Sequence, residues 1–227
     1  MKEIFCPYYF SLEAFEFSAL WKKEDHVWKA LVFLAEGFPF LTKGRQKMQL
    51  PSHVYFDQEE TIFIGEGCTI EPGAYIRGPC IIGNECVIRH NAYLRGNVIA
   101  GDRCVIGHGT EIKDSILLHD VHAAHFSYIG NSILGNKVNL GAGVKCANFR
   151  LDQAEISLRV GSERVHTGQR KLGAIIGDRT QIGCNCVLNP GTLMGQDSLC
   201  YPLLNIGGFI PSGSIVNQKN WERQWKK

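Results

Sequence analysis

The chain has 227 residues, enough for one large domain or one domain with an appendage, and its 24 basic and 22 acidic side chains leave a formal charge of +2. This charge is too small for the broad positive surface of a general nucleic-acid-binding protein, and the longest apolar stretch, residues 30–41, is interrupted and too short to span a bilayer. Because the N-terminus also lacks the apolar run of a secretory signal, we expect a cytoplasmic protein that binds neither nucleic acid nor membranes.

The first 52 residues are rich in aromatic clusters, and part of them has helical periodicity. Between residues 24 and 36, Val27, Leu31 and Leu34 recur at the spacing of one helical face. A stack of repeats needs a cover on its open end. We therefore expect residues 1–52 to form a helical N-terminal appendage that covers the first coil of the domain that follows.

From Ile64 onward the sequence repeats every six residues. Ten consecutive hexads start at positions 64 to 118, with an aliphatic residue in the first place of nine and a small or aliphatic residue in the fifth place of nine. Shorter repeats continue the pattern, and a second array begins at Ile176. A period of six fits neither a helix nor an alternating strand and is typical of a hexapeptide β-helix, with aliphatic side chains inside and glycine at the corners.

We expect this β-helix to span residues 53–216, with one interruption and a tail. Residues 151–172 break the hexads and are polar and charged, which predicts a loop or hairpin that leaves the coil. Residues 217–227 are basic and predict a short C-terminal helix with a solvated face.

The nine cysteines are odd in number, and most occupy core positions of the repeat. A small apolar side chain suits the fifth place of a hexad, so we expect free, packed thiols rather than disulfides. Five cysteines hold that place: Cys68, Cys80, Cys86, Cys104 and Cys186.

Three basic residues share one place in the repeat. In the hexapeptide-repeat proteins that this pattern resembles, three hexads close one triangular coil, so residues about 18 apart stack. Arg77, Arg95 and Lys113 each hold the second place of a hexad at this spacing, which predicts a basic column on one face. Such a column favours an anion such as phosphate, and the alternative is an edge of solvated charges.

Histidines follow a similar order. His90 and His108 hold the third place of their hexads, and His125 joins them if the coil shortens by one residue after Leu118. A metal site on this edge is an alternative, but no cysteine or carboxylate cluster completes a ligand shell, so we expect no metal. A neutral imidazole, with a pKa of about 6.5, is suited to accept a proton from an attacking amine.

Residues 107–148 carry a more specific resemblance. They read GHGTEIKDSILLHDVHAAHFSYIGNSILGNKVNLGAGVKCAN, which is similar to the acetyltransferase half of the bacterial bifunctional N-acetylglucosamine-1-phosphate uridyltransferase and glucosamine-1-phosphate acetyltransferase. The whole chain, including HVWKAL, RKLGAIIGD and NPGTLMG, resembles stand-alone proteins described as related to UDP-N-acetylglucosamine pyrophosphorylase. The resemblance implies an all-β fold, a left-handed parallel β-helix, that assembles as a homotrimer with active sites between subunits.

The resemblance also implies roles for individual residues. Acetyl-CoA would be the co-substrate, and the acetyl group would pass to the amine of glucosamine 1-phosphate or a relative. His125 falls on the family's catalytic base, and Arg95 and Lys113 fall on its phosphate-binding residues. The amino sugar would be held by Tyr128, Asn139 and Asn148.

The sequence departs from the family at three positions. Phe149 replaces a tyrosine, Ala154 stands near an expected lysine, and Cys184 replaces a serine that contacts acetyl-CoA. These departures favour an alternative, a non-catalytic scaffold or sugar-phosphate-binding protein, whereas retention of the six matched residues favours the enzyme. A further alternative is a metal-dependent lyase of the carbonic anhydrase type that uses the stacked histidines. The segment before the coil has no glycine-rich nucleotide loop and is too short for a nucleotidyltransferase domain.

Overall fold

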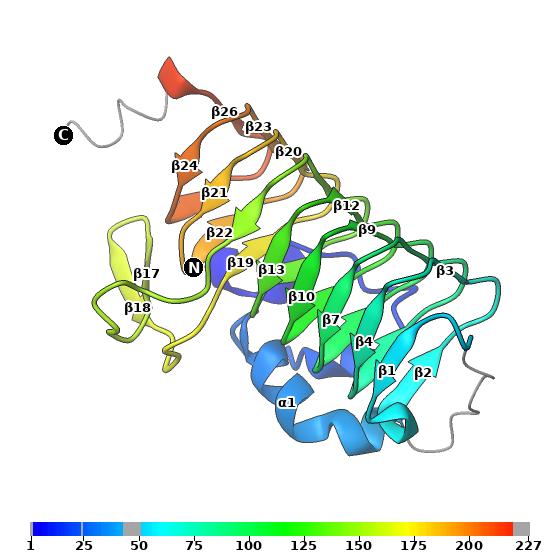
Figure 1. Ribbon diagram of the computed structural model, residues 1–227. Coiled ribbons are helices and arrows are strands. Elements are labelled where there is room, and N and C mark those ends of the chain that lie inside the picture. Colours follow the sequence, from blue (N-terminus) through cyan, green and yellow to red (C-terminus); the bar gives the residue numbers. More distant parts are fainter. Residues whose placement is uncertain (1, 24, 43–50, 220–227) are drawn as a thin grey trace.

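The structure is a computed structural model that describes residues 2–23, 25–42 and 51–219 (Figure 1). The repeats form a parallel β-solenoid with three sheets of eight strands each, which confirms the all-β repeat fold expected from the hexads. Each coil contributes one short strand to each sheet, so successive coils pair in parallel. We name the sheets after their first strands: the β1 sheet, the β2 sheet and the β3 sheet.

The strands of the three sheets alternate along the chain. The β1 sheet contains β1 (Tyr55–Asp57), β4 (Tyr75–Arg77), β7 (Tyr93–Arg95), β10 (Glu111–Lys113), β13 (Tyr128–Gly130), β16 (Lys145–Cys146), β21 (Val187–Leu188) and β24 (Asn205–Ile206). The β2 sheet contains β2 (Ile62–Ile64), β5 (Cys80–Ile82), β8 (Val98–Ala100), β11 (Ser115–Leu117), β14 (Ile133–Leu134), β19 (Ala174–Ile176), β22 (Thr192–Met194) and β25 (Phe209–Ile210). The β3 sheet contains β3 (Thr69–Ile70), β6 (Val87–Ile88), β9 (Val105–His108), β12 (His122–His125), β15 (Asn139–Leu140), β20 (Gln181–Ile182), β23 (Leu199–Cys200) and β26 (Ile215–Val216).

The core of the solenoid is filled by the first and fifth places of the hexads, as the repeat predicts. Ile76, Ile82 and Ile88 from three consecutive hexads lie in one buried cluster, together with the fifth-place thiols of Cys80 and Cys86. All nine cysteines are free, and all but the exposed Cys184 are buried or partly buried, as expected for packed thiols.

The corners follow the repeat, but glycine is only one of their residues. The fourth residue of most hexads has a positive φ, for example 56° at Glu85, 57° at Asn91 and 56° at Arg103. This left-handed conformation is uncommon for residues with a Cβ, and it recurs here because the parallel ladders on both sides fix each corner. The glycine excess therefore accounts for only part of the corner geometry.

The repeat shortens one residue earlier than the sequence pattern indicated. Leu117 pairs with Ala100 and lies in the core, whereas Leu118 belongs to the outer cluster. The expected hexad start at Leu118 was therefore wrong, because two adjacent leucines made either choice consistent with the pattern. The shortened coil places Ala123 beside Ile106.

The N-terminal segment lies along a side of the solenoid instead of covering its first coil. It contains η1 (Lys2–Ile4), η2 (Cys6–Tyr8), η3 (Ser18–Leu20) and one α-helix, α1 (Lys29–Leu41), beneath the β2 sheet in Figure 1. Its aromatic residues pack on the outer face of that sheet, which corrects the expectation of a cap. The sheet residues in this shared cluster are Phe63, Ile81, Ile99, Ile116, Ile133, Ile175, Leu193 and, partly buried, Phe209, and Leu118, which follows β11, joins them.

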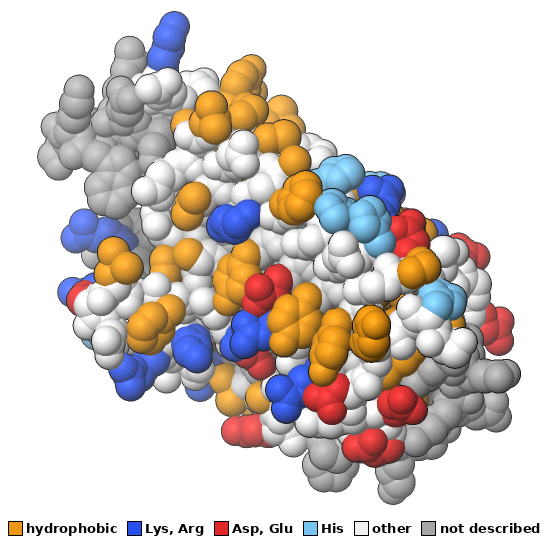
Figure 2. Space-filling view, in the orientation of Figure 1, with side chains coloured by type: hydrophobic (Ala, Val, Ile, Leu, Met, Phe, Trp, Pro, Cys, Tyr) orange, Lys and Arg blue, Asp and Glu red, His pale blue; other side chains and the backbone are white. Residues whose placement is uncertain are grey.

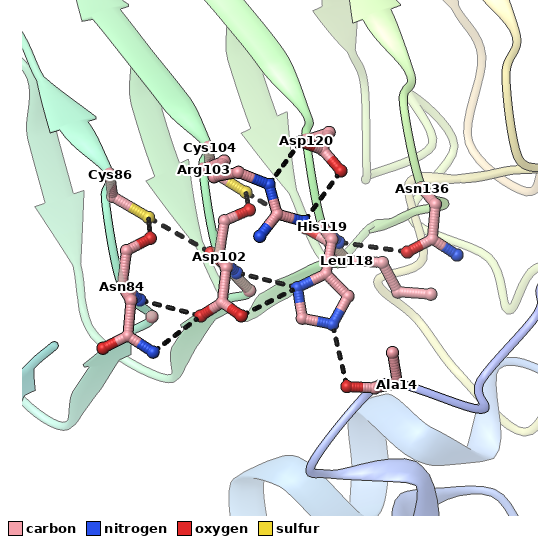
Figure 3. Close-up of polar contacts among 12 residues, drawn as sticks. Ala14, Asn84, Cys86, Asp102, Arg103, Cys104, Leu118, His119, Asp120 and Asn136 are labelled. Carbon is pink, nitrogen blue, oxygen red and sulfur yellow. Dashed lines mark hydrogen bonds and ion pairs between the residues drawn. The ribbon is translucent and has the colours of Figure 1, made fainter.

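A polar ladder ties this segment to the corner between the β2 and β3 sheets (Figure 3). The backbone N–H of Asp102 donates to Nδ1 of His119 at 2.9 Å, so Nε2 of the neutral ring carries the proton and donates to the carbonyl of Ala14 at 3.1 Å. Asn136 continues the ladder, because its Oδ1 accepts a hydrogen bond from the backbone N–H of His119. The ladder holds the N-terminal segment at the middle of the solenoid.

The predicted excursion contains a β-hairpin. β17 (Ser157–Val160) and β18 (Glu163–His166) pair antiparallel, and Ile156 and Leu158 pack against the last coils. Gly191 permits this approach, because a Cβ there would lie 2.7 Å from both side chains. One further short helix, η4 (Glu59–Thr61), precedes β2.

The expected C-terminal helix concerns residues 217–227, most of which lie outside the described residues. Within the described part of the chain, no helix is both long enough and apolar enough to cross a bilayer.

Candidate active site

His125 and Tyr128 lie on the two sides of one corner between the β3 and β1 sheets. β12 ends at His125 and β13 begins at Tyr128, with Phe126 between them at a φ of 50°. The neighbouring coils place Gly109 and Gly143 at this corner. Phe126 is 55% exposed despite its size, so the corner presents an aromatic ring beside the histidine.

The histidines meet on this corner as the sequence predicted. The rings of His90 and His108 stack with centroids 4.0 Å apart, and His125 pairs in register with His108. Figure 2 shows histidine side chains gathered on one edge of the molecule. The His108 ring also meets the edge of Phe126 at 4.6 Å. The carboxylate of Glu71 accepts from the backbone N–H of His90, and this bond lowers the pKa of Glu71. The described residues contain no group of three His, Cys, Asp or Glu side chains that could hold a metal ion.

Arg95 and Lys113 lie on neighbouring strands of the β1 sheet, next to Tyr128. β10 pairs with β7 on one side and with β13 on the other, and Glu111 faces Tyr93 and Tyr128 in the two registers. The Nη1 group of Arg95 donates to the carboxylate of Glu111 at 2.6 Å, which raises the pKa of the arginine. Nζ of Lys113 lies 3.0 Å from the carboxylate of Asp114.

The predicted basic column is aligned but its charge is compensated. Arg77 and Arg95 pair in register, and Arg77 lies 3.2 Å from the carboxylate of Asp57. With Glu111 and Asp114, each cation of the column therefore has a carboxylate beside it. The sequence contained a signal that Glu111 would lie beside this column. Glu111 directly precedes a hexad start, Ile112, and belongs to the same strand as Lys113. The face thus presents alternating donors and acceptors rather than a bare positive strip.

A chain of amides extends from Tyr128. Its hydroxyl donates to Oδ1 of Asn148 at 3.4 Å, and Nδ2 of Asn148 donates to Oδ1 of Asn131 at 2.6 Å. Burial raises the pKa of Tyr128, so its hydroxyl remains a proton donor at neutral pH. Tyr128 and Asn148, predicted from the resemblance, therefore touch each other, and Asn131 is a third member that the sequence analysis did not name.

The other predicted residues lie apart from this group, Asn139 and Cys184 on the β3-sheet side of the corner and Phe149 beyond β16 of the β1 sheet. Asn139 is on β15 of the β3 sheet and pairs in register with His122, not with His125. Cys184 is exposed and lies two coils beyond His125, next to Gly141. Phe149 is 40% exposed and bridges to Lys171 at the base of the excursion. The predicted residues therefore form one group around Arg95, Lys113, Tyr128 and Asn148, with His125 at its edge, and a second on the β3 sheet.

Comparison with known proteins finds resemblances that include the residues of the candidate site. A family model described as the GMPPB C-terminal domain matches residues 76–170. The chain is 38% identical over 105 residues to a bifunctional sugar-1-phosphate nucleotidylyltransferase/acetyltransferase of Sulfurisphaera tokodaii, and 35% identical over 106 residues to the bifunctional protein GlmU of Methanococcus maripaludis. The chain resembles the acetyltransferase part of GlmU. These alignments cover 46% and 47% of this chain but only 24% and 26% of the relatives, so the chain spans about a quarter of their length.

Two further comparisons extend over most of the chain. The uncharacterized acetyltransferase YaiX of Escherichia coli is 29% identical over 195 residues, which cover 86% of this chain and 85% of that protein. The crystal structure of the polySia-specific acetyltransferase NeuO matches with a TM-score of 0.50 and 14% identity, over 74% of this chain and 85% of that one. The NeuO comparison supports the solenoid fold.

Proposed function

We propose that this protein is an acyltransferase of the hexapeptide type that moves an acetyl group from acetyl-CoA to the amine of a sugar phosphate, glucosamine 1-phosphate or a close relative. The observation that carries the proposal is the arrangement along the β1 sheet. His125 ends β12 at the corner that leads into this sheet, Tyr128 begins β13, and Lys113 and Arg95 end the next two strands, β10 and β7. A base, a ring-orienting pair and two cations therefore lie within the span of a few strands, each about 4.8 Å from the next.

Arg95 and Lys113 would bind the phosphate. Their carboxylate partners, Glu111 and Asp114, hold the cations in place and would accept hydrogen bonds from sugar hydroxyls. Tyr128 and Asn148 would orient the ring through their linked hydroxyl and amide. Positioning of this kind lowers the barrier because the two reactants no longer have to find each other in solution.

His125 would act as the general base. As the amine nitrogen bonds to the acetyl carbonyl carbon, the C–S bond of the thioester breaks and the electron pair leaves with the thiolate. The proton lost by the amine passes to His125 and then to the thiolate, which leaves as free CoA. A histidine suits this step because its ordinary pKa, about 6.5, lies close to neutral pH.

Further elements of the proposal extend the resemblance. The proposal includes a left-handed coil, acetyl-CoA bound near Cys184 and a cytoplasmic location. A homotrimer would also explain why Asn139 lies apart from Tyr128, because Asn139 of one subunit would complete the site of its neighbour. Sedimentation as a trimer supports this element, and sedimentation as a monomer contradicts it.

The direct test is to incubate the purified protein with acetyl-CoA and glucosamine 1-phosphate and to measure the N-acetylated product by mass spectrometry. Product detection avoids the background that the nine cysteines would give in a thiol assay. Glucosamine without phosphate is the control substrate, and we expect it to react more slowly. No product at any protein concentration would favour the non-catalytic alternative.

A further inference from the structure

A row of exposed tyrosines extends the candidate site toward the first coils. Tyr55, Tyr75 and Tyr93 lie on β1, β4 and β7, paired in register, and they are 67%, 39% and 39% exposed. The rings of Tyr75 and Tyr93 meet edge to face with centroids 5.4 Å apart. Figure 2 shows hydrophobic side chains in a row over these strands, with basic and acidic side chains beside them. The acetyl transfer proposed above uses none of these three rings.

A row of cations runs beside the tyrosines. Arg77 pairs in register with Arg95, and the guanidinium of Arg95 lies over the Tyr93 ring at 5.7 Å. The ion pair between Arg77 and Asp57 uses Nε of the arginine, and the two terminal amino groups carry four further N–H donors. The two terminal amino groups of Arg77 can therefore bind an anion while Nε keeps its ion pair with Asp57.

The order of these groups matches the order of groups in one class of ligand. With the amino sugar at Tyr128 and its phosphate at Lys113 and Arg95, a second phosphate bridged through one oxygen would reach Arg77, one strand spacing of about 4.8 Å farther on. Beyond that phosphate, a flat base would meet the tyrosine row, and aromatic rings bind bases by stacking. Asp57 lies at the same end and can accept from ribose hydroxyls.

We propose that the acceptor is a nucleoside diphosphate amino sugar rather than a monosaccharide phosphate, with its second phosphate at Arg77 and its base on Tyr75 and Tyr55. This inference rests on the proposed function for the placement of the sugar. The ligand would lie along the β1 sheet from β13 across β10, β7 and β4 to β1, a span of about 19 Å.

A second copy of the chain is the competing occupant of this face. The tyrosine row is interleaved with three ion pairs, Arg77–Asp57, Arg95–Glu111 and Lys113–Asp114, all partly exposed. A subunit interface would have to desolvate these charges, whereas a phosphate- and hydroxyl-bearing ligand pairs with them directly. The charge pattern therefore favours the nucleotide sugar.

The experiment compares UDP-glucosamine with glucosamine 1-phosphate. Binding of each is measured by calorimetry, and acetyl transfer from acetyl-CoA to each is measured in parallel. The variants are Tyr75→Ala and Arg77→Ala. Arg103→Ala is the matched control, because Arg103 is equally exposed and ion-paired, with Asp120, at a different corner.

We expect the wild-type protein to bind UDP-glucosamine at least about 10-fold more tightly than glucosamine 1-phosphate. Tyr75→Ala and Arg77→Ala should each lower the affinity for UDP-glucosamine by about 10- to 100-fold and change the affinity for glucosamine 1-phosphate by less than about 2-fold. Arg103→Ala should change neither.

Two results would overturn the inference and leave the proposed function intact. One is equal affinity for the two ligands, and the other is an affinity for UDP-glucosamine that neither substitution changes. Binding as expected without acetyl transfer to either ligand would instead refute the proposed function. A change in sedimentation with Tyr75→Ala would assign the row to a subunit interface and also overturn the inference.

Discussion

Two faces of the solenoid share one backbone design and differ in what covers them. On the β2 sheet the outward positions Ile81, Ile99 and Ile116 are at most 1% exposed, because the N-terminal segment packs on them. On the β1 sheet the outward positions of β4 and β7 hold Tyr75 and Tyr93, each 39% exposed. The core inside both sheets is the same aliphatic ladder, so the outward side chains alone decide whether a face is structural or open to a ligand.

This difference limits where the protein can bind anything. The covered face cannot serve a substrate or another subunit unless the N-terminal segment leaves it. The open β1 sheet and its corner with the β3 sheet carry His125, Tyr128, Lys113 and Arg95, which are proposed to act on the acceptor within one subunit. The predictions below test this division, starting with the largest expected effect.

His125→Ala should reduce acetyl transfer by about 10²- to 10⁴-fold, the usual loss when a general base is removed. The oligomer and the binding of acetyl-CoA should stay unchanged, because the side chain is exposed and the strand remains. His122→Ala is the matched control, since His122 is an exposed histidine of the same strand. Similar rates for both variants and the wild type would remove His125 from the mechanism.

Ile99→Ala should lower the free energy of unfolding by about 2–5 kcal/mol, because it leaves a cavity under the N-terminal segment. Tyr75→Ala, at the equivalent outward position of the open face, should change it by only about 0.5 kcal/mol. Denaturant titration of both variants measures the contrast. Equal losses would mean that the two faces are covered to the same extent in solution.

Arg95→Ala and Lys113→Ala should each lower the affinity for glucosamine 1-phosphate by about 10- to 150-fold, which corresponds to the loss of one charge-assisted hydrogen bond. Affinity for unphosphorylated glucosamine should stay nearly the same. Arg77→Ala should have a much smaller effect on this monophosphate, because Arg77 lies one coil farther from His125. Equal losses for all three variants in a calorimetric titration would indicate a diffuse charged surface instead of a phosphate site.

Asp178 gives the smallest test, at the junction between the covered face and the N-terminal segment. Its carboxylate accepts from the N–H groups of Ser11 and Asn136 at 2.9 and 2.7 Å, and burial raises its pKa. A raised carboxyl pKa means that the wild-type protein loses stability as pH rises through that pKa, whereas Asp178→Asn has no such titration.

The stability of Asp178→Asn relative to the wild type should therefore increase from about pH 3 to about pH 7, by about 1.4 kcal/mol for each unit by which the pKa is raised. Denaturant titrations at the two pH values measure this difference. A relative stability that falls over the same range would show that the native environment favours the ionised carboxylate.

The repeat could be predicted from the sequence because each inward position depends on local spacing. The first and fifth places of the hexads are buried in the structure, and the stacking of His90 on His108 follows from the same spacing. The shortening near Leu117 was misplaced by one residue, because Leu117 and Leu118 satisfy the pattern equally.

Other features depend on contacts between distant segments, which a local pattern does not contain. The N-terminal segment packs on isoleucines such as Ile99, and two adjacent aliphatic residues in successive β2-sheet strands were a signal for a covered face. The neutralised column was missed for a related reason. Arg95 on β7 forms its ion pair with Glu111 on the adjacent strand β10. A search for like charges 18 residues apart does not include carboxylates at other places of the hexad.

The most direct measurement of the central claim is a crystal structure with glucosamine 1-phosphate bound. We predict that the phosphate lies within hydrogen-bond distance of Arg95 and Lys113 on the β1 sheet, that the ring contacts Tyr128 and that the amine faces His125. A ligand whose phosphate touches neither cation, or that binds elsewhere on the solenoid, would contradict the assignment of this open face and corner as the active site.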